Sequence, residues 1–416
     1  MIVHRLMRWK ILLGGLIVLA AAGYGYRTMT IPQWTTVTTG FMNNDKPYGG
    51  GAFRLRGNDV MTLKLADPVI TFKPAEQLKD PQVAEPTEAW MNNSAERLNR
   101  STVTFLRGTI ESGLVRSFQQ PAQDTAWWYS KDWVTQYVST GWMDYKLPTP
   151  KDGLSPQITK LWRSVDGGKT WTRLSWPENR NIDRLFFVDA RRGYAIGWGP
   201  QVWRTADGGQ SWQEVSLPPM ATDSREPRKT FSAVDLGPDG VLRVAYYVPM
   251  LGKVQLSSVV YRLRWDAPQF ERDVVLPDQV VVQLATADEA PGHTYSIYAL
   301  SQLGAPRNYQ DQSDKGDRTG AISTWASYEQ PKVEQLHTFD PRYKLDGLSA
   351  GKKGVLLVYA TDDKREGAPH DYTFYSRDFG KSWNEIDDGI GQGGWFDPQT
   401  NAQYALYAYT LKKRSF

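Results

Sequence analysis

The chain has 416 residues with a formal net charge of +4, and it is rich in aromatic residues (12%), Gly (36) and Pro (25). It contains no cysteine and four histidines, which excludes disulfides, Fe–S clusters and thiol nucleophiles and argues against a zinc site, so we expect no cofactor. No long basic run is present, which argues against nucleic-acid binding. Many aromatics among many turn formers favour an all-β chain of short strands.

The N-terminus combines basic residues with an apolar run. Residues 1–10 carry basic and no acidic side chains, and residues 11–26 carry no charge. This pattern predicts either a signal-anchor or a cleaved signal peptide over residues 1–27, because 16 apolar residues are fewer than the ~20 of a full span and Ala20 to Ala22 offers a cleavage site. The positive-inside rule puts residues 28–416 outside the cytoplasm. We expect a single-pass protein of the bacterial inner membrane with its bulk in the periplasm, or a secreted protein.

Residues 28–100 are expected to form an extension and linker. Possible strands lie at 34–38, 60–65 and 69–72, and three prolines among polar residues follow over 74–100. From residue 101 onward, short runs of apolar and β-branched residues recur to the C-terminus. The sequence therefore predicts one β domain over residues 101–416.

One eight-residue pattern occurs three times inside this domain. It reads SVDGGKTW at 164–171, TADGGQSW at 205–212 and SRDFGKSW at 376–383. The shared positions are Ser164, Asp166, Gly168 and Trp171; Thr205, Asp207, Gly209 and Trp212; and Ser376, Asp378, Gly380 and Trp383. Each copy joins the end of one short strand to the start of the next, which predicts a β-hairpin.

The residue types in the pattern have structural roles. Gly supplies the positive φ of a tight turn, and Asp is expected to accept hydrogen bonds from amides two residues on. The closing Trp is expected to lie under the turn and bury apolar area. We therefore predict that these carboxylates stabilise the fold and form no ligand site.

The three octapeptides resemble the Asp-box of sialidase-like and BNR-repeat β-propellers. Residues 185–197, LFFVDARRGYAIG, look like the blade lead-in of photosystem II assembly-factor-like proteins, a non-enzymatic propeller group. The resemblance is good over about 160–217 and weak elsewhere. It implies a propeller in which the Asp-box is a fold element remote from the active site.

The spacing of the octapeptides predicts the number of blades. Asp207 follows Asp166 by 41 residues, and Asp378 follows Asp207 by 171. Because 40–50 residues suit one four-stranded blade, about three blades without the pattern are expected between the second and third copies, and six or seven blades in all. Ring closure requires a terminal strand to pair with the last blade, around 403–412, and either 34–38 or 103–106 could do so.

A polar, Gly-rich stretch over residues 304–320 predicts a protruding loop. Its acidic spacing does not match a calcium-binding loop, so we expect no metal there. Loops on a rigid scaffold are the usual place for recognition residues. The candidate partner-contact residues in this loop are Arg307, Tyr309, Asp311, Asp314, Asp317 and Arg318.

Two classes of function remain open. A sialidase-like glycosidase requires an arginine trio and a Tyr/Glu pair, but the family's Arg-Ile-Pro signature is missing, and the nearest string is FRLR at 53–56. The sequence therefore favours a non-enzymatic propeller that binds a protein partner. The partner is expected to be a secreted toxin, which would make the chain an immunity protein, or alternatively a subunit of a membrane complex under assembly.

Overall fold

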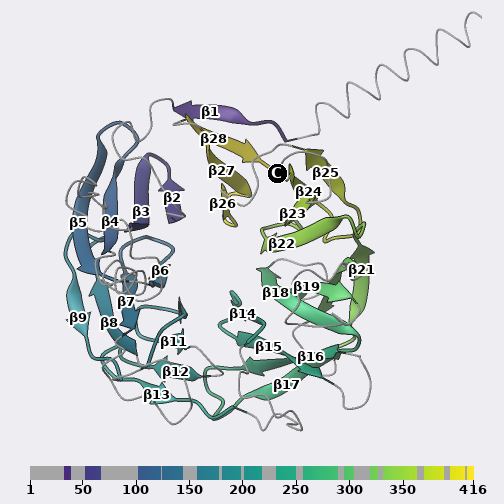
Figure 1. Cartoon of the computed structure of the whole chain (residues 1–416), viewed down its shortest axis with the longest axis horizontal. Coiled ribbons are helices and arrows are strands. Elements are labelled where there is room, and N and C mark those ends of the chain that lie inside the picture. Colours follow the sequence, from purple (N-terminus) through teal and green to yellow (C-terminus); the bar gives the residue numbers. More distant parts are fainter. Residues whose placement is uncertain are drawn as a thin grey trace, which may run out of the picture.

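The computed structural model describes residues 32–38, 52–66, 102–122, 124–143, 157–177, 180–197, 201–217, 231–249, 256–288, 295–303, 319–326, 331–362, 370–387, 394–407 and 410–416. The strands in these ranges form seven four-stranded antiparallel sheets arranged as a ring (Figure 1). The chain is therefore a seven-bladed β-propeller, the higher of the two blade numbers that the octapeptide spacing predicted. None of the described residues is helical.

The blades follow one another along the chain. Blade 1 contains β2 (Ala52–Arg56), β3 (Asp59–Ala66), β4 (Thr102–Thr109) and β5 (Gly113–Pro121). Blade 2 contains β6 (Trp127–Tyr129), β7 (Gln136–Met143), β8 (Gln157–Ser164) and β9 (Thr172–Leu174). Blade 3 contains β10 (Arg184–Phe187), β11 (Gly193–Ile196), β12 (Val202–Thr205) and β13 (Gln213–Glu214). Blade 4 contains β14 (Ala233–Leu236), β15 (Leu242–Pro249), β16 (Leu256–Leu263) and β17 (Glu271–Leu276).

The remaining three blades complete the ring. Blade 5 contains β18 (Gln279–Asp288), β19 (Tyr295–Leu303), β20 (Gly320–Ala326) and β21 (Glu334–Thr338). Blade 6 contains β22 (Tyr343–Ala350), β23 (Leu356–Asp362), β24 (His370–Ser376) and β25 (Asn384–Asp387). Blade 7 contains β26 (Gly394–Asp397), β27 (Ala402–Tyr407), β28 (Thr410–Ser415) and, as its outer strand, β1 (Thr35–Thr38). In Figure 1 the first strand of each blade lies nearest the centre of the ring and the last strand lies at the rim.

The ring closes through the N-terminal strand. β1 pairs antiparallel with β28, with Thr35 opposite Lys413, and the Thr35 hydroxyl donates to the Lys413 carbonyl at 3.0 Å. The buried guanidinium of Arg414 lies over the ring of Trp34, 4.5 Å from its centroid. Of the two closing strands that the sequence left open, the structure therefore selects 34–38. The C-terminal partner is also a hairpin of two strands, β27 and β28, where the sequence suggested one.

The predicted domain boundary at residue 101 is wrong. β2 and β3 precede that boundary, yet β3 pairs with β4 along its whole length, for example with Leu63 opposite Phe105. The propeller thus begins at β1, and residues 28–100 supply three of its strands. The long interval of 67–101 between the paired strands hid this relationship, because local patterns say nothing of pairing across such a distance. The possible strand at 69–72 lies outside the described residues.

The hydrophobic core is divided among the contacts between blades. Seven clusters of buried side chains occur in the described part of the chain, and each joins two neighbouring blades. One cluster, for example, joins blades 7 and 1 through Leu55, Val60 and Leu411. A closed ring of seven blades has seven such interfaces, so each sheet is buried on both faces by its neighbours.

Two blades, rather than about three, separate the second octapeptide from the third. These are blades 4 and 5, which lie between blade 3 and blade 6. Their strands are longer: β15 and β16 have 8 residues each and β18 has 10, compared with 4 in each of β10, β11 and β12. A 41-residue unit measured on the short-stranded blade 3 therefore underestimates the residues that each of these blades uses.

The N-terminal segment predicted as an anchor or signal lies outside the described residues. Among the residues that are described, no helix is long and apolar enough to cross a membrane.

Candidate functional site

The three octapeptides close their turns in the same way. The buried Ser164 hydroxyl accepts a hydrogen bond from the Gly168 amide and donates one to Asp166, both at 2.8 Å. Asp166 in turn accepts from the amide (3.0 Å) and the hydroxyl (2.6 Å) of Thr170. The other two copies repeat these bonds from Thr205 and Asp207 and from Ser376 and Asp378. The Asp carboxylate accepts from amides three and four residues further on, whereas the sequence predicted the amide two residues on. That nearer amide, of Gly168 in the first copy, donates to the hydroxyl at the first position of the pattern instead.

The glycine of each turn has a positive φ. Gly168, Gly209 and Gly380 have φ values of 79°, 86° and 84°, in the region that L side chains avoid. A Cβ on Gly168 would lie 2.4 Å from a ring carbon of Phe105 in blade 1. The turn thus requires glycine both for its backbone conformation and for its approach to the neighbouring blade.

The closing tryptophans tie each turn to the preceding blade. The indole nitrogen of Trp171 donates to the carbonyl of Gly168 at 3.2 Å, and Trp212 and Trp383 repeat this bond within their own turns. The ring of Trp171 packs on Phe105 and Phe118 of blade 1, with centroids 5.2 and 5.0 Å apart. The half-buried tryptophans therefore join blades, in addition to covering their own turn.

The octapeptide carboxylates are engaged in hydrogen bonds within their own turns. The hydrogen bond from the Thr170 hydroxyl holds the pKa of Asp166 well below its usual range, with further amide bonds acting in the same direction. For Asp207, burial opposes the shift, but the bonds from Ser211 and Thr205 outweigh it and lower the pKa to about 2. A carboxylate so strongly stabilised as an anion is a poor general acid or base near neutral pH.

Each octapeptide turn lies at the same end of its blade as the turn between the first two strands. The Gly167 amide donates to the carbonyl of Val134 (2.9 Å), and the Gly208 amide donates to that of Arg191 (2.8 Å). In blade 6 the Phe379 amide donates to the carbonyl of Gly354 (3.0 Å). Because strands alternate in direction, the connections between second and third strands lie at the opposite end of the ring.

A cavity of about 860 Å³ occupies the centre of the ring at the end that carries the octapeptide turns. Six blades line it through their first strands or the turns that follow them: blade 2 over 128–132, blade 3 over 186–190, blade 4 over 234–240, blade 5 over 283–287, blade 6 over 348–351 and blade 7 over 396–399. Its wall is of mixed polarity. The charged residues in it are Lys131, Asp132, Asp189 and Asp235, and the larger apolar residues include Trp128, Phe186, Leu236, Leu284, Leu348 and Phe396. Leu284, Leu348 and Phe396 also belong to the buried clusters between blades.

Most polar groups of the cavity wall are engaged in structure. The Gln283 amide bridges blades 5 and 6, donating to the Leu348 carbonyl at 2.9 Å and accepting from the Leu348 amide at 2.8 Å. Asp189 accepts from the Arg192 amide at 2.8 Å and pairs with its guanidinium at 2.7 Å. Asp132 accepts from the Val134 amide at 3.1 Å. These groups hold the turns around the cavity and are not spare for a ligand.

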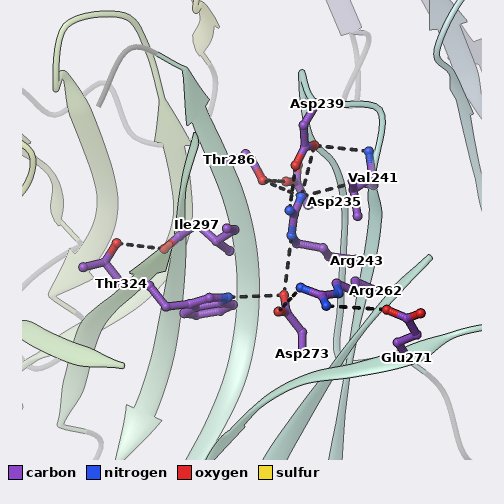
Figure 2. Close-up of polar contacts among 11 residues, drawn as sticks. Asp235, Asp239, Val241, Arg243, Arg262, Glu271, Asp273, Thr286, Ile297 and Thr324 are labelled. Atoms are coloured by element: carbon purple, nitrogen blue, oxygen red, sulfur yellow. Dashed lines mark hydrogen bonds and ion pairs between the residues drawn. The ribbon is translucent and has the colours of Figure 1, made fainter. Parts of the chain in front are cut away.

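Asp235 differs from these residues. It lies on β14 in the cavity wall, and its carboxylate accepts a hydrogen bond from the Thr286 hydroxyl of β18 at 2.6 Å (Figure 2). The Thr286 backbone amide also acts on this carboxylate. Burial raises the pKa of Asp235 to about 6, against the smaller lowering effects of Thr286 and Arg243. Perturbed carboxyl groups in a cavity are candidates for function.

A buried ionic network stands behind Asp235. The fully buried Arg243 of β15 pairs with Asp239 at 2.7 Å and with Asp273 of β17 at 3.6 Å (Figure 2). Asp273 also pairs with Arg262 of β16 at 3.5 Å and accepts from the Trp325 indole of blade 5 at 3.2 Å. The network anchors blade 4 and its β14–β15 turn to blade 5, so that Asp235 is carried by a fixed wall.

The sequence did not reveal Asp235 or this network. A signal was present in retrospect: Asp235 is a charged residue between Val234 and Leu236 in a strand, and Asp239 and Gly240 mark the following turn. The candidate partner-contact residues over 307–318 lie outside the described residues. The flanking strand ends, Leu303 of β19 and Gly320 of β20, belong to a second-to-third strand connection, at the end of the ring opposite the cavity.

Arg54 belongs to the FRLR string that we compared with the sialidase signature. Its guanidinium lies 5.5–5.7 Å from the ring centroids of Trp127, Tyr129 and Trp395, and its Nε donates to the Tyr129 hydroxyl at 2.7 Å. These contacts join blades 1, 2 and 7. The guanidinium is therefore enclosed by aromatic rings. The arginine of a sialidase signature would instead point at a substrate carboxylate. Among the described residues, no group of three or more His, Asp or Glu could hold a metal ion.

No protein-family model and no curated protein sequence matches this chain. Several solved structures do. YCF48 bound to a D1 peptide is 9% identical, with 76% of this chain and 89% of that chain covered and a TM-score of 0.45. The GH74 xyloglucanase of Xanthomonas campestris is 14% identical (92% and 53% covered, TM-score 0.49), and the Swd1 β-propeller domain of Myceliophteria thermophila is 11% identical (92% and 100% covered, TM-score 0.49). At these identities the likeness concerns the fold alone, and the fold leaves the function open.

Proposed function

We propose that this chain is a non-catalytic β-propeller that binds a protein partner in its central cavity. The observation that carries the proposal is the cavity of about 860 Å³, which six blades line with both apolar and polar residues. A concavity that combines apolar walls with convergent polar groups is the usual form of a binding site. Its walls are strands and tight turns, so the cavity loses little conformational entropy when a partner binds.

The polar groups of the cavity favour binding over glycoside hydrolysis. Hydrolysis of a glycosidic bond ordinarily requires two carboxyl groups on either side of the bond. Asp132 and Asp189 are engaged by their own turns, which leaves Asp235 as the cavity carboxylate outside a turn. We therefore expect the purified chain to hydrolyse no sialoside or other fluorogenic glycoside. Turnover that Asp235→Asn abolished would overturn this proposal and favour the glycosidase.

Site-specific photo-crosslinking in cells tests the binding proposal. A photoreactive amino acid at Gln399, an exposed residue at the cavity, should give a discrete protein adduct. The matched control is the same amino acid at Val115, which is 67% exposed on the outer strand β5. Equal adducts from both positions, or none from Gln399, would contradict a partner in the cavity.

The loop over residues 307–318 stays a second predicted contact. Replacing it with a short Gly-Ser turn should leave folding intact and weaken the adduct at Gln399 if the partner spans both ends of the ring. An unchanged adduct would restrict the contact to the cavity end.

The cellular setting of the proposal rests on the N-terminal sequence. A basic start followed by an uncharged run supports an extracytoplasmic propeller, tethered or secreted. In that setting the partner is a secreted toxin, with this chain as its immunity protein, or alternatively a membrane complex that the chain helps to assemble. Alkaline phosphatase fused after residue 60 should be active, and an inactive fusion with a cytosolic full-length protein would contradict this location.

A further inference from the structure

Asp235 carries the negative charge that the ionic network between blades 4 and 5 leaves unbalanced. The network holds three aspartates, Glu271 and three arginines, because Glu271 pairs with Arg262 at 3.5 Å and with Arg264 at 3.1 Å. Asp239 has the Arg243 guanidinium at 2.7 Å, and Asp273 has Arg262 at 3.5 Å and Arg243 at 3.6 Å. In the part of the chain that the structure describes, Asp235 forms no ion pair within 4.0 Å and is held by the Thr286 hydroxyl.

Arg243 does not compensate this charge directly. Its Nη1 reaches the Thr286 hydroxyl oxygen at 3.5 Å, and that hydroxyl donates to Asp235 (Figure 2). A threonine hydroxyl thus stands between the guanidinium and the carboxylate. Asp235 belongs to the wall of the central cavity, where an opposite charge beside a partly buried carboxylate gains more than it would in water.

The surroundings of Asp235 fit a long side chain with a terminal cation. The wall includes Phe186 and Leu236 of blades 3 and 4 and Leu284 and Leu348 of blades 5 and 6, together with the charged Lys131 and Asp132 of blade 2. Such walls accommodate the methylene groups of lysine or arginine while the charged end meets the carboxylate. One carboxylate suits a single positive charge, and the described residues offer no cluster of ligands for a metal ion.

We infer that the central cavity binds a lysine or arginine side chain of the partner polypeptide, in a sequence where apolar residues flank it. Asp235 is the residue that pairs with its positive charge. The inference rests on the proposed function, because it takes the partner's site to be the cavity. It assigns the specificity of that site to one carboxylate.

Two blocked peptides test the inference on the full chain at pH 7.5: acetyl-Leu-Lys-Leu-amide and its norleucine analogue, which lacks the charge. Calorimetric titration should show the lysine peptide binding at least about tenfold more tightly, as expected for a charge-assisted hydrogen bond. Asp235→Asn keeps an oxygen for Thr286 and should remove this preference, while the norleucine peptide binds as before. Asp340→Asn, an exposed charge change in the turn between blades 5 and 6, should leave the preference intact.

Two outcomes of the peptide titrations overturn the inference, and a third comes from a diamine control. One is equal binding, or no binding, of the two peptides to the unmodified chain. The other is a preference for lysine that survives Asp235→Asn in a variant whose unfolding remains cooperative. Either result together with an intact adduct at Gln399 would leave the proposed function standing, whereas loss of that adduct would remove the proposed function itself. A small diamine binding as well as the lysine peptide would show that the cavity selects the charge without the peptide, and would overturn the polypeptide ligand.

Discussion

Single hydroxyls carry much of the stability of the octapeptide turns. Ser164→Ala leaves the buried Gly168 amide without its acceptor, which should lower the free energy of unfolding by about 1–3 kcal/mol. Asp166→Ala and Asp207→Ala remove acceptors for amides further along the turns and should cost a similar amount. Val165→Ala, in the same turn at a side chain 57% exposed, should change stability by less than about 0.5 kcal/mol. Denaturant unfolding measures the free energy of unfolding of all four variants. A variant that kept its stability but lost partner capture would contradict a structural role.

Comparing substitutions at two glycines distinguishes the cost of a positive φ from the cost of a steric clash. Gly57 and Gly168 both have positive φ, 60° and 79°, but a Cβ on Gly57 would meet nothing within 4 Å. Gly57→Ala should therefore cost about 1 kcal/mol, from the left-handed conformation alone. Gly168→Ala also drives a Cβ into Phe105 and should cost about 2–4 kcal/mol. Equal losses of unfolding free energy would show that the contact with blade 1 relaxes easily.

The strand β1 is the element on which ring closure depends. A chain that begins at residue 39 lacks β1 and Trp34, so it exposes the edge of β28 and removes one of the two aromatic rings that Arg414 contacts. Compared with a chain that begins at residue 32, it should be less stable by at least about 3 kcal/mol, the usual cost of losing a packed tryptophan. Thermal unfolding of the two truncations measures the difference, and identical transitions would mean that the ring closes without β1.

The whole propeller should respond to pH in two opposing ways. The folded chain binds a proton at Asp235 more tightly than the unfolded chain, since the pKa is raised to about 6, so this group favours folding increasingly as pH falls from about 7 to about 4. The octapeptide carboxylates, with lowered pKa values, stabilise the fold above about pH 4, and this stabilisation is lost in more acidic solution. His337, whose pKa burial lowers, opposes folding as it protonates below about pH 6.5.

The variant Asp235→Asn tests how much Asp235 contributes to the pH dependence of the unfolding free energy. At pH 8 the variant should be more stable than the unmodified chain by up to about 3 kcal/mol, because it lacks the buried charge. The difference should shrink as pH falls through about 6 and vanish below about pH 3, where Asp235 is protonated in both the folded and the unfolded chain. The charged groups that act on Asp235 are Arg243 and Asp239. The ion pairs of Arg243 with Asp239 and Asp273 do not include Asp235 and should stay intact in the variant. A difference that did not change with pH would show that Asp235 does not titrate in this range.

Local chemistry was enough to predict the turns and the architecture. Each octapeptide closes within eight residues, so its hydroxyl, carboxylate, glycine and indole find one another without help from the rest of the chain, and the repeat spacing indicates blades. Pairing across long intervals was not predictable in this way. The sheet that joins β3 to β4, and the choice of residues 34–38 to complete blade 7, depend on which edges remain unpaired once the ring is assembled. The central cavity exists only because six blades place their first strands around one axis, and Asp235 becomes distinctive only there. Its neighbours in sequence are ordinary strand residues, while its burial and its contacts with Arg243 and Thr286 depend on another strand and another blade.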